Sequence, residues 1–388
     1  MGSITYAWLV AAVGFCLLAL VRTIYILLAT PIAHISHLES SERPKVCILL
    51  PVRNEADRVL RRNLRSLITQ SYDHFEIIAV EDNSTDDSLS ILREVEQNAG
   101  GKLRVIEGEP PPDDWLGKLF SLHQAKHFAK GEWLLLTDAD VIYSEKAVES
   151  ALRFAIENHL DALSLLPRAK MWTFWEQVLI PVMAWLSLMR VSTTQANRQR
   201  SRACFGYGNF ILLRRAAHDS IGGFETYKGD ILDDCATMEH LKRCGYRVMV
   251  ADGSELLQAR VYSSLGEMLK GFGKNTFPAL RFSHARLLGV VLMETLFIFL
   301  PLTYWFCELL TEYMRLSPKV LLPGLAVVFF FSTMLAFGLR MRANWRFFVL
   351  YPVGHIAAIV VLVYSMLIYT LRRGGRWKDR VVRGFVNQ

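Results

Sequence analysis

Cysteine is sparse in this sequence and forms no pair that suits a metal site or a disulfide framework. The six cysteines, none of them in a Cys-x-x-Cys arrangement, are Cys16, Cys47, Cys204, Cys235, Cys244 and Cys307. Two of them fall in long apolar stretches. This pattern argues against a zinc site and a disulfide-stapled protein, and it favours reduced thiols in a domain that faces the cytosol. No internal repeat or low-complexity segment is evident.

Charge is almost absent from residues 4–29, where Arg22 is the single charged residue. This stretch is long enough to cross a bilayer. A secretory signal peptide would carry basic residues ahead of its apolar core, and none precedes this one. We therefore expect residues 1–30 to form an uncleaved transmembrane anchor.

A second charge-poor region covers residues 287–371, which we expect to form transmembrane or re-entrant helices. Its candidate spans are 288–310, 320–339 and 347–371, and each reaches the roughly 20 residues that a crossing helix needs. The first two contain a proline, Pro301 and Pro323 respectively. Either proline could kink or interrupt its helix, so a re-entrant or interfacial segment is an alternative to a full span.

Basic residues flank the last apolar stretch in two clusters. One is a loop with Arg340, Arg342 and Arg346, and the other is the basic tail of residues 372–388. The tail carries the larger cluster, which predicts a cytoplasmic tail and therefore a re-entrant or interfacial position for one proline-containing segment. The net charge of +7 suits an anionic inner leaflet better than nucleic acid. The expected location is the inner (plasma) membrane, multi-pass, with the soluble domain facing the cytoplasm.

The region 43–281 has the composition of a soluble domain and alternates strand-like with helix-like segments. The strands expected from apolar runs are 46–52, 75–80, 103–106 and 133–137, and the helices expected between them are 57–70, 86–97 and 119–129. This order predicts an α/β fold with a doubly wound, mostly parallel sheet, as in Rossmann-like domains. Ligands of such sheets bind beyond the carboxyl ends of the strands.

Two carboxylates one residue apart follow the apolar run of residues 133–136. They are Asp138 and Asp140, in the sequence Thr137-Asp138-Ala139-Asp140. An Asp-x-Asp pair at a strand end can share a divalent metal (Mg or Mn) and, through it, hold a diphosphate. The same pair also arises in turns and helix caps, so its neighbours in the sequence decide between these interpretations.

Polar motifs follow the first two strands as well. The first strand runs into Pro51-Val52-Arg53-Asn54-Glu55, and the second into Glu81-Asp82-Asn83-Ser84-Thr85-Asp86. A carboxylate at Asp82 can accept the imide N–H of a uracil ring, which would select a pyrimidine nucleotide. The alternative is that these side chains cap the next helix. We favour the cap for Asp86 and the ligand contact for Asp82.

The three motifs, taken in order, resemble the signature of family 2 glycosyltransferases with the GT-A fold, and the resemblance covers roughly residues 45–274. It implies that Asp82 recognises the nucleotide base, and that Glu55 lies in the nucleotide pocket. It also implies that Asp138 and Asp140 handle the sugar diphosphate and the metal, with Asp140 the direct ligand. The remaining donor-binding residues predicted from these motifs are Pro51, Arg53 and Asn54.

The resemblance also supplies a catalytic base. Family members carry an Asp at a helix start, eleven residues before a Gly-aromatic pair, and Asp234 stands in that relation to Gly245-Tyr246 here. Asp233 occupies the place usually held by Glu. Adjacent carboxylates repel when both are ionised, which raises their proton affinity and suits a base. The alternative is an N-terminal helix cap. The resemblance implies a single displacement that inverts the anomeric centre.

Three further segments indicate which branch of this family the chain resembles most. Residues 110–118, 273–275 and 377–380 resemble hopanoid-associated membrane glycosyltransferases and their carotenoid-glycosylating relatives, and more distantly ceramide glucosyltransferase. Lys118 is then expected at the donor phosphates, although an exposed loop lysine is an equal alternative. The Gln-x-x-Arg-Trp motif of processive relatives is absent, and residues 270–277 stand in its place. This argues against polymer synthesis.

Residues 172–191 are rich in tryptophan and favour an interfacial helix over a buried core helix. The residues expected on the acceptor side are Gly206, Tyr207, Gly208, Asn209 and Lys274. The sequence thus predicts a hexosyltransferase that moves one sugar from a nucleotide sugar, preferably a uridine diphosphate sugar, to a membrane lipid of the hopanoid, sphingolipid or carotenoid type. The alternatives are a processive polysaccharide synthase and a noncatalytic membrane scaffold.

Overall fold

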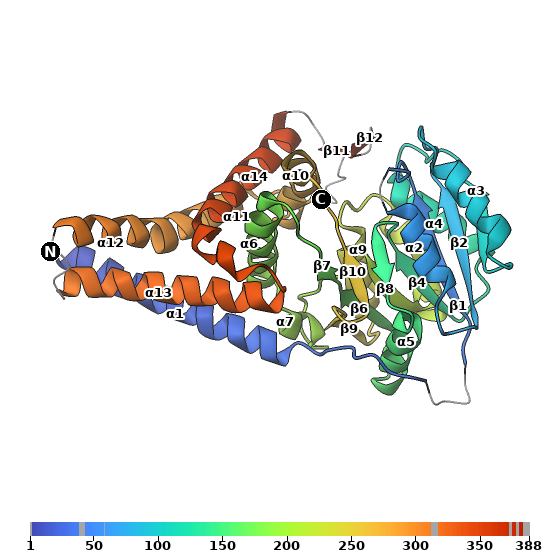
Figure 1. The fold of residues 1–388 in the computed structure, drawn as a ribbon, viewed down its shortest axis with the longest axis horizontal. Helices are drawn as coiled ribbons and strands as arrows, with labels where there is room; N and C mark the ends of the chain where they lie inside the picture. The colour runs from blue at the N-terminus through green and yellow to red at the C-terminus, as the bar shows by residue number, and fades with distance from the viewer. Residues whose placement is uncertain are drawn as a thin grey trace. The chain divides into compact units, whose positions relative to one another are not determined.

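The computed structural model describes residues 2–38, 43–57, 59–311, 317–371, 375–377 and 380–382. The chain divides into two compact units (Figure 1). The helical unit comprises Met1–Ala29, Met171–Ser192 and Tyr262–Gly375, and the α/β unit comprises Thr30–Lys170, Thr193–Val261 and Arg376–Gln388. Most of the predicted basic tail, residues 372–388, lies outside the described residues.

The α/β unit contains a seven-stranded sheet in the order β3-β2-β1-β4-β8-β6-β9. Its strands are β1 (Val46–Val52), β2 (Phe75–Glu81), β3 (Leu103–Glu107), β4 (Trp133–Thr137), β6 (Ala162–Leu166), β8 (Phe210–Arg214) and β9 (Val248–Asp252). Neighbouring strands pair in parallel, except that β8 is antiparallel to both β4 and β6. The structure therefore confirms the predicted α/β class with a mostly parallel sheet.

The central strands are continuous apolar runs because both faces of this sheet are covered. All five residues of β4 are buried, and so are six of the seven in β1. The helices of this unit are α2 (Leu60–Ile68), α3 (Ser88–Asn98), α4 (Gly117–Phe128), α5 (Ala147–Glu157), α7 (Thr193–Asn197), α8 (Arg215–Ser220), η1 (Gly223–Tyr227) and α9 (Asp233–Arg243). The short strands β5 (Val141–Tyr143), β10 (Leu257–Ala259) and β7 (Arg168–Ala169) form a second sheet, and β11 (Gly375–Trp377) pairs with β12 (Arg380–Val382).

The helix predicted over residues 57–70 begins later, at Leu60. The backbone N–H groups just before it are bound by the next loop instead of by a helical turn. The N–H of Glu55 donates to Ser88 Oγ at 2.8 Å, and the N–H of Ala56 donates to Asp86 Oδ2 at 3.0 Å. The residues before α2 are therefore held against the segment that follows β2.

The helical unit contains long apolar helices. Its elements are α1 (Ser3–Ala29), α6 (Phe174–Arg190), α10 (Leu265–Ala279), α11 (His284–Glu294), η2 (Thr295–Phe299), α12 (Leu300–Thr311), α13 (Pro318–Arg340), η3 (Trp345–Leu350) and α14 (Tyr351–Leu371). Within the described residues, four helical stretches are long and apolar enough to cross a membrane: Ser3–Ala29, His284–Thr311, Pro318–Arg340 and Trp345–Leu371. The predicted apolar helices are thus present.

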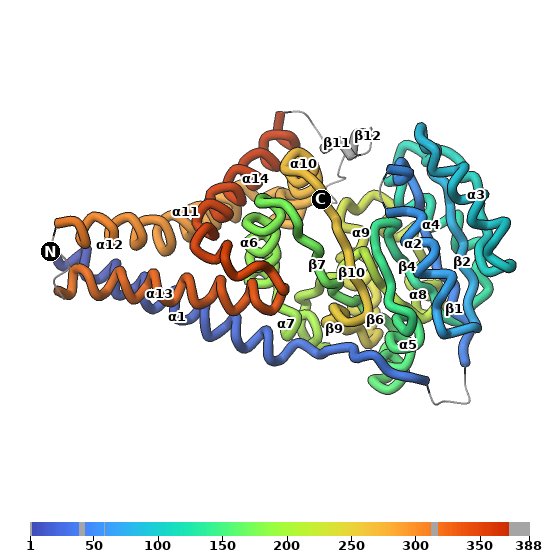
Figure 2. Tube along the Cα trace, viewed as in Figure 1, coloured from blue at the N-terminus to red at the C-terminus, as the bar shows by residue number. Residues whose placement is uncertain are grey.

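The two proline-containing stretches remain helical. A π-helical turn, η2, comes directly before Pro301, which cannot donate a backbone hydrogen bond to the preceding turn. Helix α13 continues through Pro323. Figure 2 shows α12 and α13 running alongside α1, whereas α14 runs obliquely to them and packs on α6 and α10.

Helix α6, the predicted interfacial helix, begins with a capping box between Thr173 and Glu176. One face of α6 is buried within the helical unit, where Trp185 Nε1 donates to Thr23 Oγ1 at 3.0 Å. Its aromatic beginning is exposed, with 67% of Trp172 and 43% of Phe174 accessible. An exposed aromatic end beside a buried face suits a helix at a membrane surface, and that location stays a prediction.

Candidate active site

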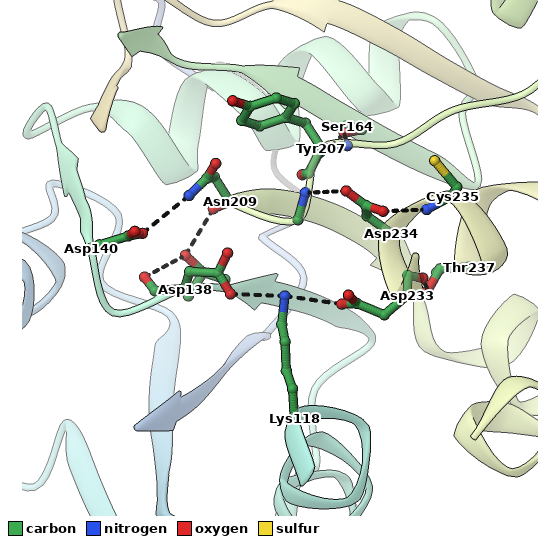
Figure 3. A network of polar contacts seen from close by, with 12 residues as sticks. Lys118, Asp138, Asp140, Ser164, Tyr207, Asn209, Asp233, Asp234, Cys235 and Thr237 are labelled. Carbon is green, nitrogen blue, oxygen red and sulfur yellow. Dashed lines mark hydrogen bonds and ion pairs between the residues drawn. The ribbon is translucent and has the colours of Figure 1, made fainter. Parts of the chain in front are cut away.

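The loop after β4 presents the Asp-x-Asp pair at the carboxyl edge of the large sheet (Figure 3). Buried polar contacts fix this loop. Thr137 Oγ1 donates to the carbonyl of Asn209 at 2.9 Å, and Asn63 Nδ2 donates to the carbonyl of Val141 at 2.6 Å. Both Asp138 and Asp140 remain partly accessible. The two carboxylates are therefore held in place while still open to a ligand.

Asp140 faces the loop that precedes β8. Asn209 Nδ2 donates to Asp140 Oδ1 at 3.2 Å, and Asn209 itself is buried. This loop reaches the same sheet edge because β8 is antiparallel, so that Phe210 at its start pairs with Thr137 at the end of β4. Asn209, predicted on the acceptor side, thus contacts the predicted metal pair directly.

The first turn of α9 carries Asp233 and Asp234. Asp234 accepts two backbone hydrogen bonds, from Gly208 N to Oδ2 at 3.1 Å and from Cys235 N to Oδ1 at 2.7 Å. Burial, and then the charge of Asp233, raise the pKa of Asp234 to about 6, although Lys118 and the two N–H groups act in the opposite direction. Asp234 is thus both anchored at the helix start and poised to take up a proton near neutral pH.

Lys118, on the first turn of α4, joins the two acidic sites. Its Nζ atom lies 2.8 Å from Asp138 Oδ1 and 2.9 Å from Asp233 Oδ2. Burial alone would lower the pKa of Lys118, but these two carboxylates raise it well above its usual range. Lys118 therefore carries a permanent positive charge between the Asp-x-Asp pair and α9. The sequence predicted its place on the donor side but not its contact with Asp233.

Gly206 and Gly208 have no side chains, which leaves room for Asp234 and Lys118 beside them. A Cβ atom at Gly206 would lie 2.6 Å from the backbone oxygen of Asp234. A Cβ atom at Gly208 would lie 3.1 Å from Lys118 Nζ. Between them, Tyr207 is tied to β6 because its N–H donates to Ser164 Oγ at 2.8 Å. Both glycines were predicted on the acceptor side, and they also set the position of Asp234.

The loops after β1 and β2 form one connected structure. Arg53 Nη1 donates to the carbonyls of Asp82 and Asn83, at 2.5 Å and 2.9 Å. Asn54, at φ 48°, accepts from the N–H of Thr85 through its side chain at 2.8 Å. Pro51 lies in β1 itself, paired with Val80 of β2. Arg53 and Asn54 therefore shape the loops, whereas their predicted contact with the donor is not tested.

Three acidic residues in these loops differ in role. Asp86 accepts from the N–H of Ser88, the first residue of α3, at 3.0 Å, but the N-cap residue of α3 is Asp87, whose side chain makes no capping hydrogen bond. Burial opposes the ionisation of Asp86, but its hydrogen bonds outweigh this effect and lower its pKa. Glu55 and Asp82 are buried at 6% and 5% exposure. A buried carboxylate at a strand end is the feature expected of a selective base contact.

A divalent metal fits the donor atoms at Asp138 and Asp140. No group of three or more His, Cys, Asp or Glu side chains suited to a metal occurs among the residues that the structure describes. Carboxylate oxygens are ligands that Mg²⁺ and Mn²⁺ prefer, and the metal role of Asp138 and Asp140 stays a prediction. Lys274 lies on α10 in the helical unit, where its carbonyl accepts from Tyr369 Oη at 2.8 Å, and its acceptor-side role stays a prediction.

Sequence comparison finds a family model that matches the first part of the α/β unit. Residues 47–222 match the model of glycosyl transferase family 2. An uncharacterized glycosyltransferase of Haemophilus influenzae is 28% identical over 118 residues, which is 30% of this chain and 44% of that protein. A poly(ribitol-phosphate) β-glucosyltransferase of Bacillus spizizenii is 33% identical over 119 residues, 30% of this chain and 18% of that protein. The chain spans less than half the length of the first of these relatives.

Structural comparison extends over nearly the whole chain. The mannosyltransferase PcManGT of Pyrobaculum calidifontis, solved in complex with GDP-Man and Mn²⁺, superposes with a TM-score of 0.57 and 18% sequence identity. The superposition covers 95% of this chain and 99% of that one. This likeness concerns the fold. Residues 47–222 therefore match the glycosyl transferase family 2 model, and the chain shares the GT-A type of fold that its motifs predicted.

Proposed function

We propose that this chain transfers a single sugar from a nucleotide-sugar donor, a uridine diphosphate sugar, to a hydroxyl group of a membrane lipid, with inversion at the anomeric carbon. The comparisons support the transferase class. The observation that carries the proposal is the arrangement around Gly208, where a base with a raised pKa and the Asp-x-Asp pair contact the same short loop.

Asp234 acts as the general base. The acceptor hydroxyl gives its proton to the Asp234 carboxylate while its oxygen forms a bond to the anomeric carbon. The bond between that carbon and the diphosphate oxygen breaks, and the nucleoside diphosphate leaves with the electron pair. A pKa near 6 keeps Asp234 ionised at neutral pH and still basic enough to accept the proton. Its two backbone hydrogen bonds hold the carboxylate in one orientation.

Asp138 and Asp140 would hold a divalent metal on the donor side of the site. The metal, when bound, neutralises the charge that grows on the leaving diphosphate. Lys118 adds a second positive charge on this side, since its Nζ lies 2.8 Å from Asp138. The solved PcManGT complex contains a nucleotide sugar and Mn²⁺, which is consistent with this donor half.

Asp82 selects the nucleotide base by accepting the imide N–H of uracil. Its backbone is fixed on both sides, because its N–H donates to the carbonyl of Val52 at 2.8 Å and its carbonyl accepts from Arg53. A buried carboxylate on a fixed backbone favours a nucleotide base that donates a hydrogen bond to it. PcManGT was solved with a guanine nucleotide, so the competing donor class for the test is a guanosine diphosphate sugar.

We infer a lipid acceptor because the chain contains apolar helices that are long enough to cross a membrane. We place α1, the α11–α12 stretch and α13 across the inner membrane, and α14 with α6 and α10 at its cytoplasmic surface. This arrangement leaves the basic loop at residues 340–346 and the tail on the same, cytoplasmic side, in accord with the positive-inside rule. It differs from the expectation of a re-entrant or interfacial position for one proline-containing segment, because both of those segments cross here and residues 347–371 lie at the surface. The catalytic domain then faces the cytoplasm, where nucleotide sugars are made.

The test uses the full chain in native lipid extract with radiolabelled uridine and guanosine diphosphate sugars, each with and without Mg²⁺ or Mn²⁺. We expect a labelled lipid whose mass exceeds that of its acceptor by one sugar, formed from a uridine donor. Asp140→Ala should abolish metal-dependent transfer, and Asp234→Asn should abolish transfer at any metal concentration. A ladder of products would instead support a processive synthase, and no product from any donor would support a scaffold.

A further inference from the structure

The helical unit contains an open groove that the proposed reaction does not use. It has a volume of about 370 Å³ and lies between the end of α6, the end of α10 and the start of α11. Apart from two arginines its walls are apolar, and the residues that line it include Arg190, Leu280, Arg286, Gly289, Val290 and Met293. A groove lined by two cations and otherwise by apolar side chains has the chemical pattern of a lipid site.

Backbone carbonyl groups accept hydrogen bonds from the two arginines that line the groove. Arg190 Nη1 donates to the carbonyl of Ala279 at 2.9 Å, and Arg286 Nη1 approaches the carbonyl of Leu280 at 3.3 Å. Both carbonyls belong to the end of α10, the negative pole of that helix, which favours cations nearby. The end of α6 is held in turn because Arg22 Nη2 donates to the carbonyl of Met189 at 2.8 Å. Both groove arginines are exposed.

The turn between α10 and α11 concentrates further positive charge here. Arg281 and Phe282 both adopt a left-handed conformation, with φ 53° at each. This conformation is costly for residues other than glycine. Arg281 is exposed at this turn, five residues before Arg286. A planar guanidinium fork matches the oxygens of a phosphate, so a pair of them favours a phosphate group over a carboxamide or a sugar.

The apolar wall accommodates a hydrocarbon chain. On α11 it is made by Gly289, Val290 and Met293, and a Cβ atom at Gly289 would meet no other atom within 4 Å. Exposed leucines continue along the same helical stretch, with 47% of Leu292 and 42% of Leu300 accessible. A soluble phosphate would use only the arginines, whereas a phospholipid uses both the arginines and this wall.

We propose that this groove binds an anionic phospholipid of the bilayer, with the headgroup phosphate between Arg190 and Arg286 and an acyl chain along Gly289, Val290 and Met293. The inference rests on the proposed membrane location but not on the sugar-transfer reaction. It gives the helical unit a lipid partner distinct from the acceptor, because the acceptor supplies a hydroxyl to Asp234 whereas this site recognises a phosphate.

The experiment measures retention of phosphatidylglycerol by the full chain in detergent, by native mass spectrometry, against phosphatidylcholine and against inorganic phosphate. The double variant Arg190→Gln/Arg286→Gln should bind phosphatidylglycerol about tenfold more weakly, as expected when charge-assisted hydrogen bonds are lost. Gly289→Leu keeps both arginines and fills open space, so it should weaken binding similarly without disturbing the fold.

Two variants serve as matched controls. Arg346→Gln removes an exposed arginine from η3, and Ala285→Leu enlarges an exposed side chain that precedes Arg286 on α11. Both should bind the lipid within about twofold of the original chain, since neither residue lines the groove. An equal loss in the controls, unchanged binding in the groove variants, or full competition by millimolar inorganic phosphate would overturn the proposal. Failure of the chain to fractionate with membranes would instead refute the membrane location.

Discussion

The Nζ atom of Lys118 lies 2.9 Å from Asp233 Oδ2, although Lys118 belongs to the predicted donor side and Asp233 to the pair with the catalytic base. One positive charge is therefore shared between the two halves of the site. Because Lys118 lowers the pKa of the neighbouring Asp234, a change at the donor side is expected to alter the proton affinity of the base.

Lys118→Met tests this coupling. Loss of the ammonium group should raise the pKa of Asp234 above its value of about 6, so the acidic limb of the pH profile of kcat/KM should move to higher pH. Transfer at neutral pH should fall about tenfold, as expected when a charge-assisted contact is lost. Lys126→Met is the control, because Lys126 lies on the same helix and pairs with Asp219 outside the site. An unshifted acidic limb would refute the coupling.

The pH dependence of the reaction follows from Asp234. A base must be ionised to accept a proton, so kcat/KM should be constant above about pH 7 and fall tenfold per pH unit below about 6. Asp234→Asn should lower kcat by about 10² to 10⁴-fold at every pH. Asp230→Asn is the control, since Asp230 precedes α9 and also has a raised pKa. A comparable loss in Asp230→Asn would point to a structural effect.

As pH rises through the titration of Asp234, the stability of the folded chain should decrease while its activity increases. The folded-state pKa of Asp234 is raised from 3.8 to about 6, so the folded chain binds more protons than the unfolded chain between these values. The free energy of unfolding therefore decreases as pH rises through this window. Asp234→Asn lacks this loss and should melt at a higher temperature than the original chain at pH 7.5. The measurement is the melting temperature of Asp234→Asn and of the original chain at pH 4 and at pH 7.5. An equal difference between the two chains at both pH values would contradict the titration of Asp234.

Gly206→Ala should damage the site through packing. The new Cβ would lie 2.6 Å from the backbone oxygen of Asp234 and 3.0 Å from Met238 Cγ, so α9 or the loop must shift. We expect a loss of about 1–3 kcal/mol in the free energy of unfolding and a larger relative loss in kcat than in donor binding. Gly266→Ala is the control, because its Cβ would meet only Ser264 Oγ, at 3.9 Å. Retained activity in Gly206→Ala would show that the loop is not fixed against α9.

A buried contact between a histidine and a glutamate in the helical unit gives a prediction about stability alone. His355 Nδ1 lies 2.5 Å from Glu294 Oε2, and both side chains are almost fully buried. His355→Phe leaves the glutamate without this partner and should lower the free energy of unfolding by about 3–5 kcal/mol. The double variant Glu294→Leu/His355→Phe should recover most of that loss. Unfolding in mixed micelles by increasing dodecyl sulfate is the measurement, and additive losses in the double variant would exclude a coupled pair.

The motifs at the strand ends were predictable because each follows an apolar run, and parallel strands deliver their ends to one edge of a sheet. The amino-acid sequence is therefore enough to place Asp82, Asp138 and Asp140 at one edge of the sheet. The start of α2 at Leu60 was not predictable in the same way, because Ser88 and Asp86 hold the preceding N–H groups from a loop about thirty residues away.

The other contacts that the sequence did not predict join residues that are far apart in the chain. Lys118 and Asp233 are far apart in sequence, and no periodic pattern connects them. The same holds for Glu294 and His355, which lie on different apolar helices. The length of α14 was predictable from its composition, but its oblique course depends on close packing. A Cβ at Gly354, for example, would lie 2.3 Å from the carbonyl oxygen of Val178 on α6.

The reversed direction of β8 divides the site into parts that can vary separately. The loops after β1, β2 and β4 leave the sheet at its carboxyl edge, whereas residues 206–209 reach that edge from the beginning of β8. Substitutions before β8 would therefore reshape the surroundings of Asp234 without lengthening any donor loop. Insertions after β8 would emerge at the opposite edge. Exchange of residues 199–205 between related chains keeps the contact of Asn209 with Asp140 and the close approach of Gly208 to Lys118, so it should change the predicted acceptor side and leave the donor side intact.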